Sequence, residues 1–259
     1  MMSVQHEMES KMKTGGISAD WLKVIAMITM VIDHTGAVLF PGEALWRMVG
    51  RVAFPVYMWL LVVGFLHTSN VEKYICRMFL FSLLSEIPFD LALEGTLCTF
   101  QYQNVFWTLT LCLCMLRCLK RILDRTEGMA KWKRILPAAV LIAASMAACE
   151  WLHFDYGCTA PVLAAAFYFY VRCQKPSLPA GFCLFCLSYL ADPVLNGYAK
   201  SGVAALQIAL AYASSEVYGI LAVPLIARYN GVRRWKRGKM LFYLFYPVHL
   251  LILYMIVRK

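Results

Sequence analysis

The chain has 259 residues, of which 61% are hydrophobic and only 15% charged, and its mean hydropathy is +0.62. This composition excludes an ordinary soluble domain and indicates an integral membrane protein. The formal net charge of +10 would suit a nucleic-acid-binding protein, but the basic residues gather in two loops beside apolar segments, at 117–134 and 228–239. Cytoplasmic membrane loops carry such an excess of Lys and Arg, so we expect membrane lipid as the partner and no nucleic acid.

Residues 1–16 form a polar N-terminal tail that lacks the apolar core and cleavage pattern of a removable signal peptide. From residue 17 to residue 259, apolar segments of about 20 residues recur with short polar interruptions, which predicts a single all-α domain, a polytopic bundle of transmembrane helices. The expected spans are 21–40, 48–67, 74–93, 104–121, 135–153, 156–173, 179–195, one or two within 201–228, and 240–257.

The charges of the connecting segments predict the orientation of these spans. Basic and acidic segments alternate along the chain in the way expected for a cytoplasmic N-terminus in the inner (cytoplasmic) membrane. The segment 201–228 leaves the number of spans open. One long helix there gives nine spans and keeps the basic 228–239 loop in the cytoplasm, whereas two short helices give ten and place that loop outside.

The first span, WLKVIAMITMVIDHTGAVLF, contains Lys23 near its start and Asp33 and His34 two thirds of the way along. Charged groups inside a membrane helix are costly and usually face a cavity with a function. Lys23 and His34 are eleven residues apart, which puts them on one helix face about 16 Å apart along the axis. Asp33 points about 100° away from His34, so we expect its partner on another helix. A snorkelling Lys23 and a purely structural, hydrogen-bonded His34 are the alternatives.

Further polar groups recur within the later spans. Arg51 begins the second span one turn after Arg47, and because arginine stays charged, a buried Arg51 needs an anionic partner, for which Asp33 is the simplest choice. Glu86 and Asp90 lie one turn apart near the outer end of the third span. The remaining polar candidates are Asn104, Asp155, Tyr246 and His249.

Seven segments carry a resemblance to a known family. In chain order they are LKVIAMITMVIDHTG, GRVAFPVYMWLLVVGF, YICRMFLFSLLSEIPFDL, NVFWTL, DYG, RYNG and MLFYLFYPVHLLILY. Together they resemble the TraX family, named for a conjugation-system protein associated with N-terminal acetylation of pilin. The family is similar in turn to polytopic membrane acyltransferases that acetylate cell-surface sugars, in which a basic residue precedes a catalytic His by eleven positions.

The resemblance implies an acetyltransferase with acetyl-CoA as the cytoplasmic donor, no metal, and an amine or hydroxyl acceptor at the outer side. A pilin-like N-terminus and a surface glycan are both compatible acceptors. A proton-coupled membrane transporter and a non-catalytic membrane subunit remain the alternative functions, because buried ionisable residues also build proton relays and lock helices together.

The same resemblance assigns roles to the polar residues. His34 is the expected general base or acyl carrier, with Asp33, Arg51, Asn104 and Glu86 completing the catalytic set. Arg51 and Asn104 are expected to stabilise the oxyanion or hold the acceptor. The phosphates of CoA are assigned to Lys23, Arg77, Arg233, Arg234 and Lys236. For the basic residues of the 228–239 loop, contact with anionic lipid is the preferred interpretation. His249, Asp155 and Tyr246 form a secondary candidate set.

Overall fold

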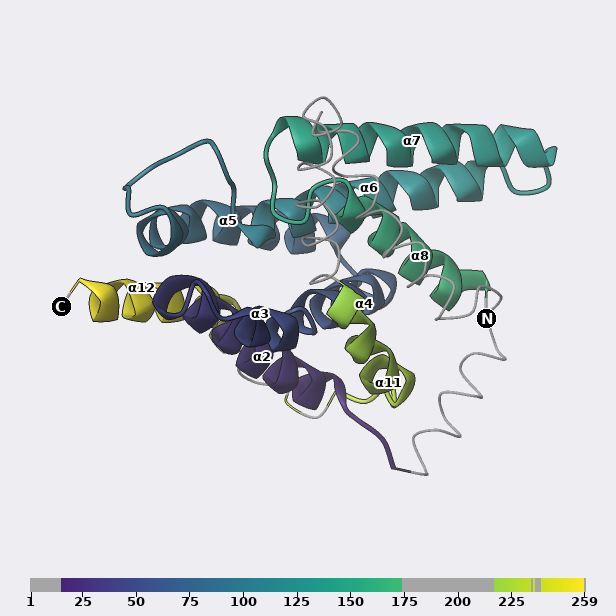
Figure 1. Cartoon of the computed structure of the whole chain (residues 1–259). Helices are drawn as coiled ribbons and strands as arrows, with labels where there is room; N and C mark the ends of the chain where they lie inside the picture. The colour runs from purple at the N-terminus through teal and green to yellow at the C-terminus, as the bar shows by residue number, and fades with distance from the viewer. Residues whose placement is uncertain (1–14, 174–216, 234, 236–238, 259) are drawn as a thin grey trace, which may run out of the picture. The chain divides into compact units, whose positions relative to one another are not determined.

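The computed structural model describes residues 15–173, 217–233, 235 and 239–258 (Figure 1). The regular elements of this part of the chain are helices, which confirms the predicted all-α fold. The elements are α2 (Ala19–Leu39), α3 (Ala44–Gly50), α4 (Ala53–His67), α5 (Val71–Leu93), α6 (Val105–Arg125), α7 (Lys131–Trp151), α8 (Thr159–Cys173), the 3-10 helix η2 (Val217–Leu221), α11 (Ala222–Ala227) and α12 (Lys239–Val257). The predicted span 179–195, most of 201–228, and Arg234 and Lys236 lie outside the described residues.

Each predicted span between residues 21 and 173, and the last one at 240–257, corresponds to helical structure. Four helical segments of the described chain are long and apolar enough to cross a membrane: Ala19–Leu39, Ala44–His67, Lys131–Trp151 and Met240–Val257. Helix α5 exposes a stripe of apolar side chains at three- and four-residue intervals, Leu80, Leu83, Leu84 and Ile87. An exposed apolar face of this kind suits contact with lipid, so the protein is a helical membrane protein.

The chain divides into two compact units. The first comprises residues 1–60 and 215–259, with α2, α3, the beginning of α4, η2, α11 and α12. The second comprises residues 61–214, with the end of α4 and helices α5 to α8. That residues 17–259 act as a single domain stays a prediction.

Helix α2 of the first unit begins where the Ser18 hydroxyl accepts a hydrogen bond from the backbone N–H of Trp21, at 3.4 Å. Such a cap satisfies one of the free amides of the first turn. The helix ends at Leu39, two residues before Pro41. Most of its buried residues recur every three or four positions and so form one face, Ala19, Leu22, Ala26, Met30, Asp33 and Gly36, and Asp20 of the first turn is buried as well.

Two glycines allow α2 and α3 to approach each other closely. A Cβ atom on Gly36 of α2 would collide with the side chain of Trp46 on α3, and a Cβ atom on Gly50 of α3 would collide with Asp33 on α2. Each helix therefore contributes a glycine opposite a larger residue of its neighbour. This contact fixes the position of the Asp33 carboxyl group.

Helices α2 and α12 run side by side in the same direction. Lys23, near the start of α2, lies over the ring of Phe242, near the start of α12, and His34 lies beside Tyr246 and His249 further along. The backbone just before α2 is hydrogen-bonded to the segment before α12, from Ile17 N to Arg228 O (2.8 Å) and from Ala19 N to Val232 O (2.9 Å). Both helices therefore start on the same side, and the number of spans, which depends on residues 174–216 outside the described part of the chain, stays a prediction of nine or ten.

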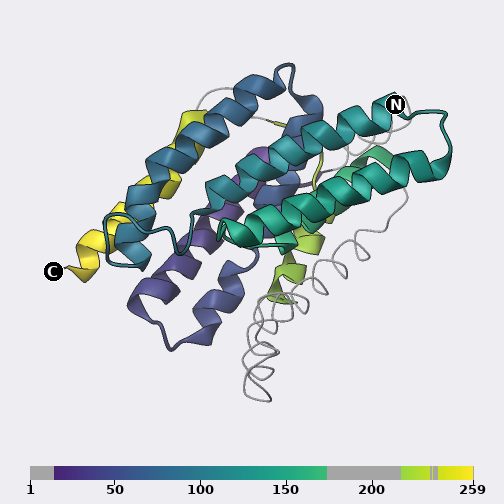
Figure 2. The same cartoon turned by 90° about the horizontal axis from the view of Figure 1, so that it is seen from above.

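Helix α6 is the centre of the second unit, where it contacts α5, α7 and α8. Figures 1 and 2 both show α6 and α7 lying side by side. One face of α6 is buried along its length, with Phe106, Leu109, Leu113, Leu116 and Leu123 at helical spacing. The last two turns also carry Arg117, Lys120, Arg121 and Asp124, so apolar packing and charged contacts share one helix.

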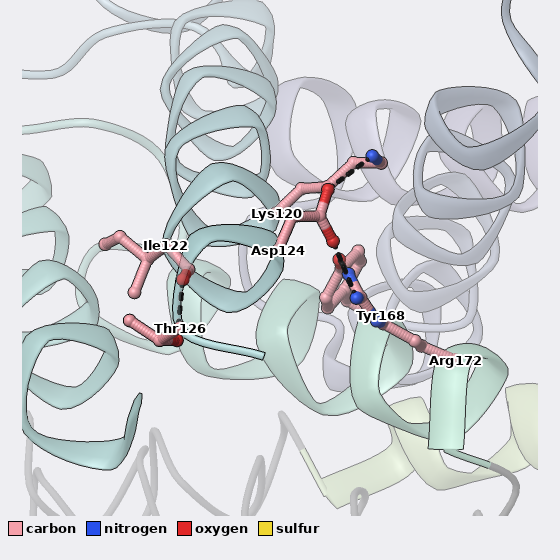
Figure 3. Close-up of polar contacts among 6 residues, drawn as sticks. All are labelled: Lys120, Ile122, Asp124, Thr126, Tyr168 and Arg172. Carbon is pink, nitrogen blue, oxygen red and sulfur yellow. Dashed lines mark hydrogen bonds and ion pairs between the residues drawn. The ribbon is translucent and has the colours of Figure 1, made fainter. Parts of the chain in front are cut away.

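Charged side chains near one end of α6 connect it to α8 (Figure 3). Asp124 accepts hydrogen bonds from Lys120 Nζ and from Arg172 Nη2 of α8, both at 2.7 Å. Arg172 also donates to the hydroxyl of Tyr168, at 2.6 Å. The hydrogen bonds from Lys120 and Arg172 hold the pKa of Asp124 below its ordinary value.

We expect Gly36→Ala to lower the free energy of unfolding by about 1–3 kcal/mol, because the added methyl group has no space against Trp46. Thermal unfolding of the purified protein in detergent measures the change. Gly42→Ala is the matched control, since nothing lies within 4 Å of a Cβ atom at that position. Equal stability of the two variants would contradict the close packing of α2 on α3.

We expect Asp124→Asn to lower stability by at most about 1 kcal/mol at pH 7, because the ion pairs are solvent-exposed. A carboxyl whose folded pKa is depressed stabilises the fold above its unfolded pKa and loses that contribution as the pH falls through the folded pKa. The difference between wild type and variant should therefore start to shrink near pH 4 and keep falling as the pH drops through the lowered folded pKa of Asp124. Melting temperatures measured between pH 3 and pH 7 test this, with Glu127→Gln as the control at an exposed carboxylate. A difference that persists at low pH would show that Asp124 acts through something other than its charge.

Candidate functional site

Asp33 and His34 are neighbours on α2, but their side chains contact different helices of the first unit. Asp33 is 7% exposed and reaches α3, whereas His34 is half-buried and reaches α12. This divergence follows from the rotation of about 100° between successive helical residues. The prediction that Asp33 finds its partner on another helix is confirmed.

Asp33 forms an ion pair with Arg47 of α3. Its Nη1 atom lies 2.7 Å from Asp33 Oδ2 and also donates to the backbone carbonyl of Asp33, at 3.4 Å. Arg51 is buried as well, and its positive charge also acts on Asp33. The sequence-based prediction named Arg51 alone and missed Arg47, one turn earlier on α3.

His34 forms a pair with His249 of α12. The Nδ1 atom of His34 lies 2.6 Å from Nε2 of His249, while the ring centroids are 4.9 Å apart and the ring planes differ by 3°. Because the nitrogens are much closer than the centroids, the two imidazoles meet edge to edge, the geometry of an in-plane hydrogen bond. The buried ring of Tyr246 meets both imidazoles edge-on, at 5.8 Å and 5.6 Å. The structure thus joins two of the secondary candidates to His34.

Lys23 contacts the same helix near its other end. Its ammonium group lies 4.8 Å from the ring centroid of Phe242 and 3.5 Å from Oδ1 of the buried Asp20. The other oxygen of Asp20 accepts a hydrogen bond from Trp235 N, at 2.8 Å, in the basic loop. Lys23 and His34 therefore share the α2 face that contacts α12, as their spacing predicts. Of the loop candidates within the described residues, Arg233 is exposed.

The remaining candidates belong to the second unit. Arg77 lies on α5, with its guanidinium carbon 5.6 Å from the centroid of the Tyr74 ring. Glu86, on the same helix, accepts hydrogen bonds from Asn104 Nδ2 and from Trp107 Nε1 (2.7 Å) through its Oε2 atom. Its Oε1 atom is buried and has no hydrogen-bond partner among the described residues.

Asn104 is fully engaged in hydrogen bonds that hold the second unit together. Its Oδ1 atom caps α6 by accepting from Phe106 N at 3.0 Å, and its Nδ2 atom donates to Ser82 O (2.9 Å) and to Glu86. An amide group has two hydrogens to donate, and both are used. The predicted role of Asn104 toward an oxyanion would require one of these bonds to be released.

Asp155 lies in the turn between α7 and α8. Its carboxylate accepts a hydrogen bond from the Tyr102 hydroxyl, and its backbone carbonyl accepts one from Thr108 Oγ1, at 2.6 Å. Tyr156, the next residue, has φ +64°, a conformation that non-glycine residues rarely adopt. Residue-level sequence reasoning singled out Asp155 but had no signal for Tyr102, which is brought beside it by the fold.

A family model described as TraX protein matches residues 18–257 of this chain. The chain belongs to the TraX family. It is 31% identical, over 91% of its length and 94% of the relative's, to a probable fimbrial assembly protein FimC, serogroup H1, of Dichelobacter nodosus. A second relative, an uncharacterized protein of Rickettsia prowazekii (strain Madrid E), is 47% identical over 38 residues, 15% of each chain. No solved structure matches the chain.

We expect a double-mutant cycle between Asp33→Asn and Arg47→Met to give a coupling energy of about 1 kcal/mol or more, since Asp33 is buried and the pair is hydrogen-bonded. Unfolding free energies of the wild type, both single variants and the double variant provide the measurement. The control cycle replaces Arg47 by the exposed Arg233, for which the coupling should be near zero. If both cycles give the same coupling, Asp33 and Arg47 do not form a stabilising pair.

Proposed function

We propose that this TraX-family membrane protein is an acetyltransferase that moves an acetyl group from cytoplasmic acetyl-CoA to an amine or hydroxyl acceptor at the outer side of the inner membrane. The observation that carries the proposal is the His34–His249 pair inside the first unit. A titratable imidazole within a membrane helix is expensive to keep and usually serves a function. The family's association with pilin acetylation supports the choice of reaction.

In the proposed reaction, His34 takes a proton from the acceptor amine or hydroxyl as that atom attacks the thioester carbon. The bond from the acceptor atom to the acetyl carbon forms, an oxyanion develops on the carbonyl oxygen, and the carbon–sulfur bond then breaks. The CoA thiolate leaves and takes up a proton. Positioned general bases of this kind contribute about 10²- to 10⁴-fold in rate.

Two arginines are the candidates for stabilising the oxyanion. Arg47 pairs with Asp33, the residue before His34, and Arg51 is buried one turn after Arg47. Preorganised positive groups near a developing negative charge are a major source of rate enhancement. Arg47 is held by Asp33, which limits its motion and so supports a fixed position for its charge.

For the donor, we assign the cytoplasmic end of α2. Lys23 and the exposed Arg233 are basic groups near the starts of α2 and α12, where the phosphates of CoA would arrive from the cytoplasm. The partnership of Lys23 with the buried Asp20 orients its ammonium group. For the acceptor, the relative described as a probable fimbrial assembly protein favours a pilin-like N-terminus, with a surface glycan as the alternative.

A proton-coupled transporter is the second candidate function, because of two carboxyl groups of α5. Glu86 Oε1 and Asp90 Oδ1 are buried and have no hydrogen-bond partner among the described residues. Carboxyl groups in such surroundings are typical of proton relays.

To test the proposed function, purified protein is mixed with radiolabelled acetyl-CoA and an envelope fraction of the producing cells as the acceptor. We expect release of free CoA thiol and transfer of label, both reduced about 10²- to 10⁴-fold in His34→Ala. His67→Ala is the control, because His67 is an exposed histidine whose ring contacts the Val63 carbonyl of its own helix. Retention of transfer in a folded His34→Ala protein would rule out the role of His34, and absence of both transfer and CoA binding in the wild type would favour the transporter.

A further inference from the structure

We propose that His249 is a positioning residue that holds His34 in a single tautomer, with the proton on Nδ1 and the lone pair on Nε2. The pair then presents Nε2 of His34 as the atom that accepts a proton. The catalytic meaning of this arrangement rests on the function proposed above, but the tautomer itself is a property of the resting protein and is testable without any reaction.

The argument starts at the backbone of α12. Nδ1 of His249 lies 2.9 Å from the carbonyl oxygen of Phe245, one turn earlier in the same helix. A carbonyl oxygen can only accept a hydrogen bond, so Nδ1 of His249 carries a hydrogen and donates it. A neutral imidazole has one N–H group, and Nε2 of a neutral His249 is therefore an acceptor.

The tautomer of His34 follows from that of His249. Its Nδ1 atom lies 2.6 Å from Nε2 of His249, and the rings lie nearly in one plane, so one of these two nitrogens donates to the other. Since Nε2 of His249 is the acceptor, Nδ1 of His34 is the donor. The remaining nitrogen of His34, Nε2, then has a lone pair, and it has no hydrogen-bond partner among the described residues.

The local structure of α12 keeps His249 in this position. Pro247 lies two residues before it, inside the same helix. Tyr246 and His249 lie three residues apart on one helix face and are both buried, and the Tyr246 ring contacts both imidazoles. Packing therefore restrains both rings, and the Phe245 carbonyl sets the direction of the hydrogen-bond chain.

In many catalytic sites a carboxylate accepts the hydrogen bond from Nδ1–H of the histidine and so fixes its tautomer. Here a neutral imidazole takes the place of the carboxylate. When Nε2 of His34 takes up a proton, the Nδ1 proton of His34 can pass to Nε2 of His249. The positive charge then resides on His249, whose Nδ1–H still donates to Phe245 O and whose new Nε2–H donates to Nδ1 of His34. Proton and charge are balanced, and the pair spreads the charge over two rings.

The direct test is nitrogen NMR of the full-length protein in detergent micelles, with ¹⁵N-labelled histidine at neutral pH. Signals of His34 are identified by their loss in His34→Asn. We expect Nδ1 of His34 to be protonated and Nε2 to be unprotonated, and we expect this preference to be lost in His249→Phe, which keeps an aromatic ring but has no acceptor. A protonated Nε2 in the wild type, or an unchanged His34 tautomer in His249→Phe, would overturn the proposal.

Activity provides the second readout. In the acetyl-transfer assay, His249→Gln retains an acceptor near the position of Nε2 and should stay within about tenfold of the wild type, whereas His249→Phe should lose about 10²-fold or more. His67→Phe is the control, because His67 is an exposed histidine of α4 whose ring contacts Val63 O of its own helix. Equal losses in the Gln and Phe variants would show that His249 only fills space. If the protein transfers no acetyl group at all, the NMR result still decides the tautomer and only the proposed function fails.

Discussion

A polar side chain inside a membrane helix must find its partners on neighbouring helices, because lipid supplies none. Asp33 and His34 find their partners on two different helices. The carboxylate of Asp33 pairs with Arg47 of α3, and the imidazole of His34 pairs with His249 of α12. Two adjacent residues thus tie α2 to two other helices of the first unit. The part of α2 that carries Asp33 and His34 is therefore held by α3 and by α12.

Two glycines make the contact between Asp33 of α2 and Arg47 of α3 possible. Gly36 and Gly50 remove side-chain volume where α2 and α3 meet, and the resulting close approach leaves Asp33 directly against α3. Short helix-to-helix distances at small residues are common in membranes, where packing replaces the hydrophobic driving force. The same principle explains why the Asp33 carboxylate has so little freedom to move away from Arg47.

The helices were predictable from the sequence because hydropathy and segment length are local properties. The spans predicted at 21–40 and 240–257 differ from α2 and α12 by no more than two residues at either end. The shared face of Lys23 and His34 was predictable for the same reason, since it depends only on helical geometry. Both residues contact α12, as one face requires.

The partners of the polar groups could not be predicted in the same way, because they depend on which helices pack together and at what distance. Arg47 and Arg51 are one turn apart, so the sequence could not distinguish which of them forms the close ion pair with Asp33. His249 was recognised as a buried histidine but was not connected with His34, 215 residues away. In the second unit, Asn104 was recognised as a polar candidate from the sequence. Its hydrogen bonds to Ser82 and Glu86 depend on how α5 packs against the start of α6, which the sequence does not show.

The pairing of the first described membrane helix with the last one also bears on how the protein is made. During synthesis, α2 enters the membrane with Asp33 and can meet Arg47 almost at once, since the two residues are 14 positions apart. His34 can pair with His249 only after α12 has left the ribosome. The imidazole pair therefore forms only after the chain has been synthesised beyond residue 249.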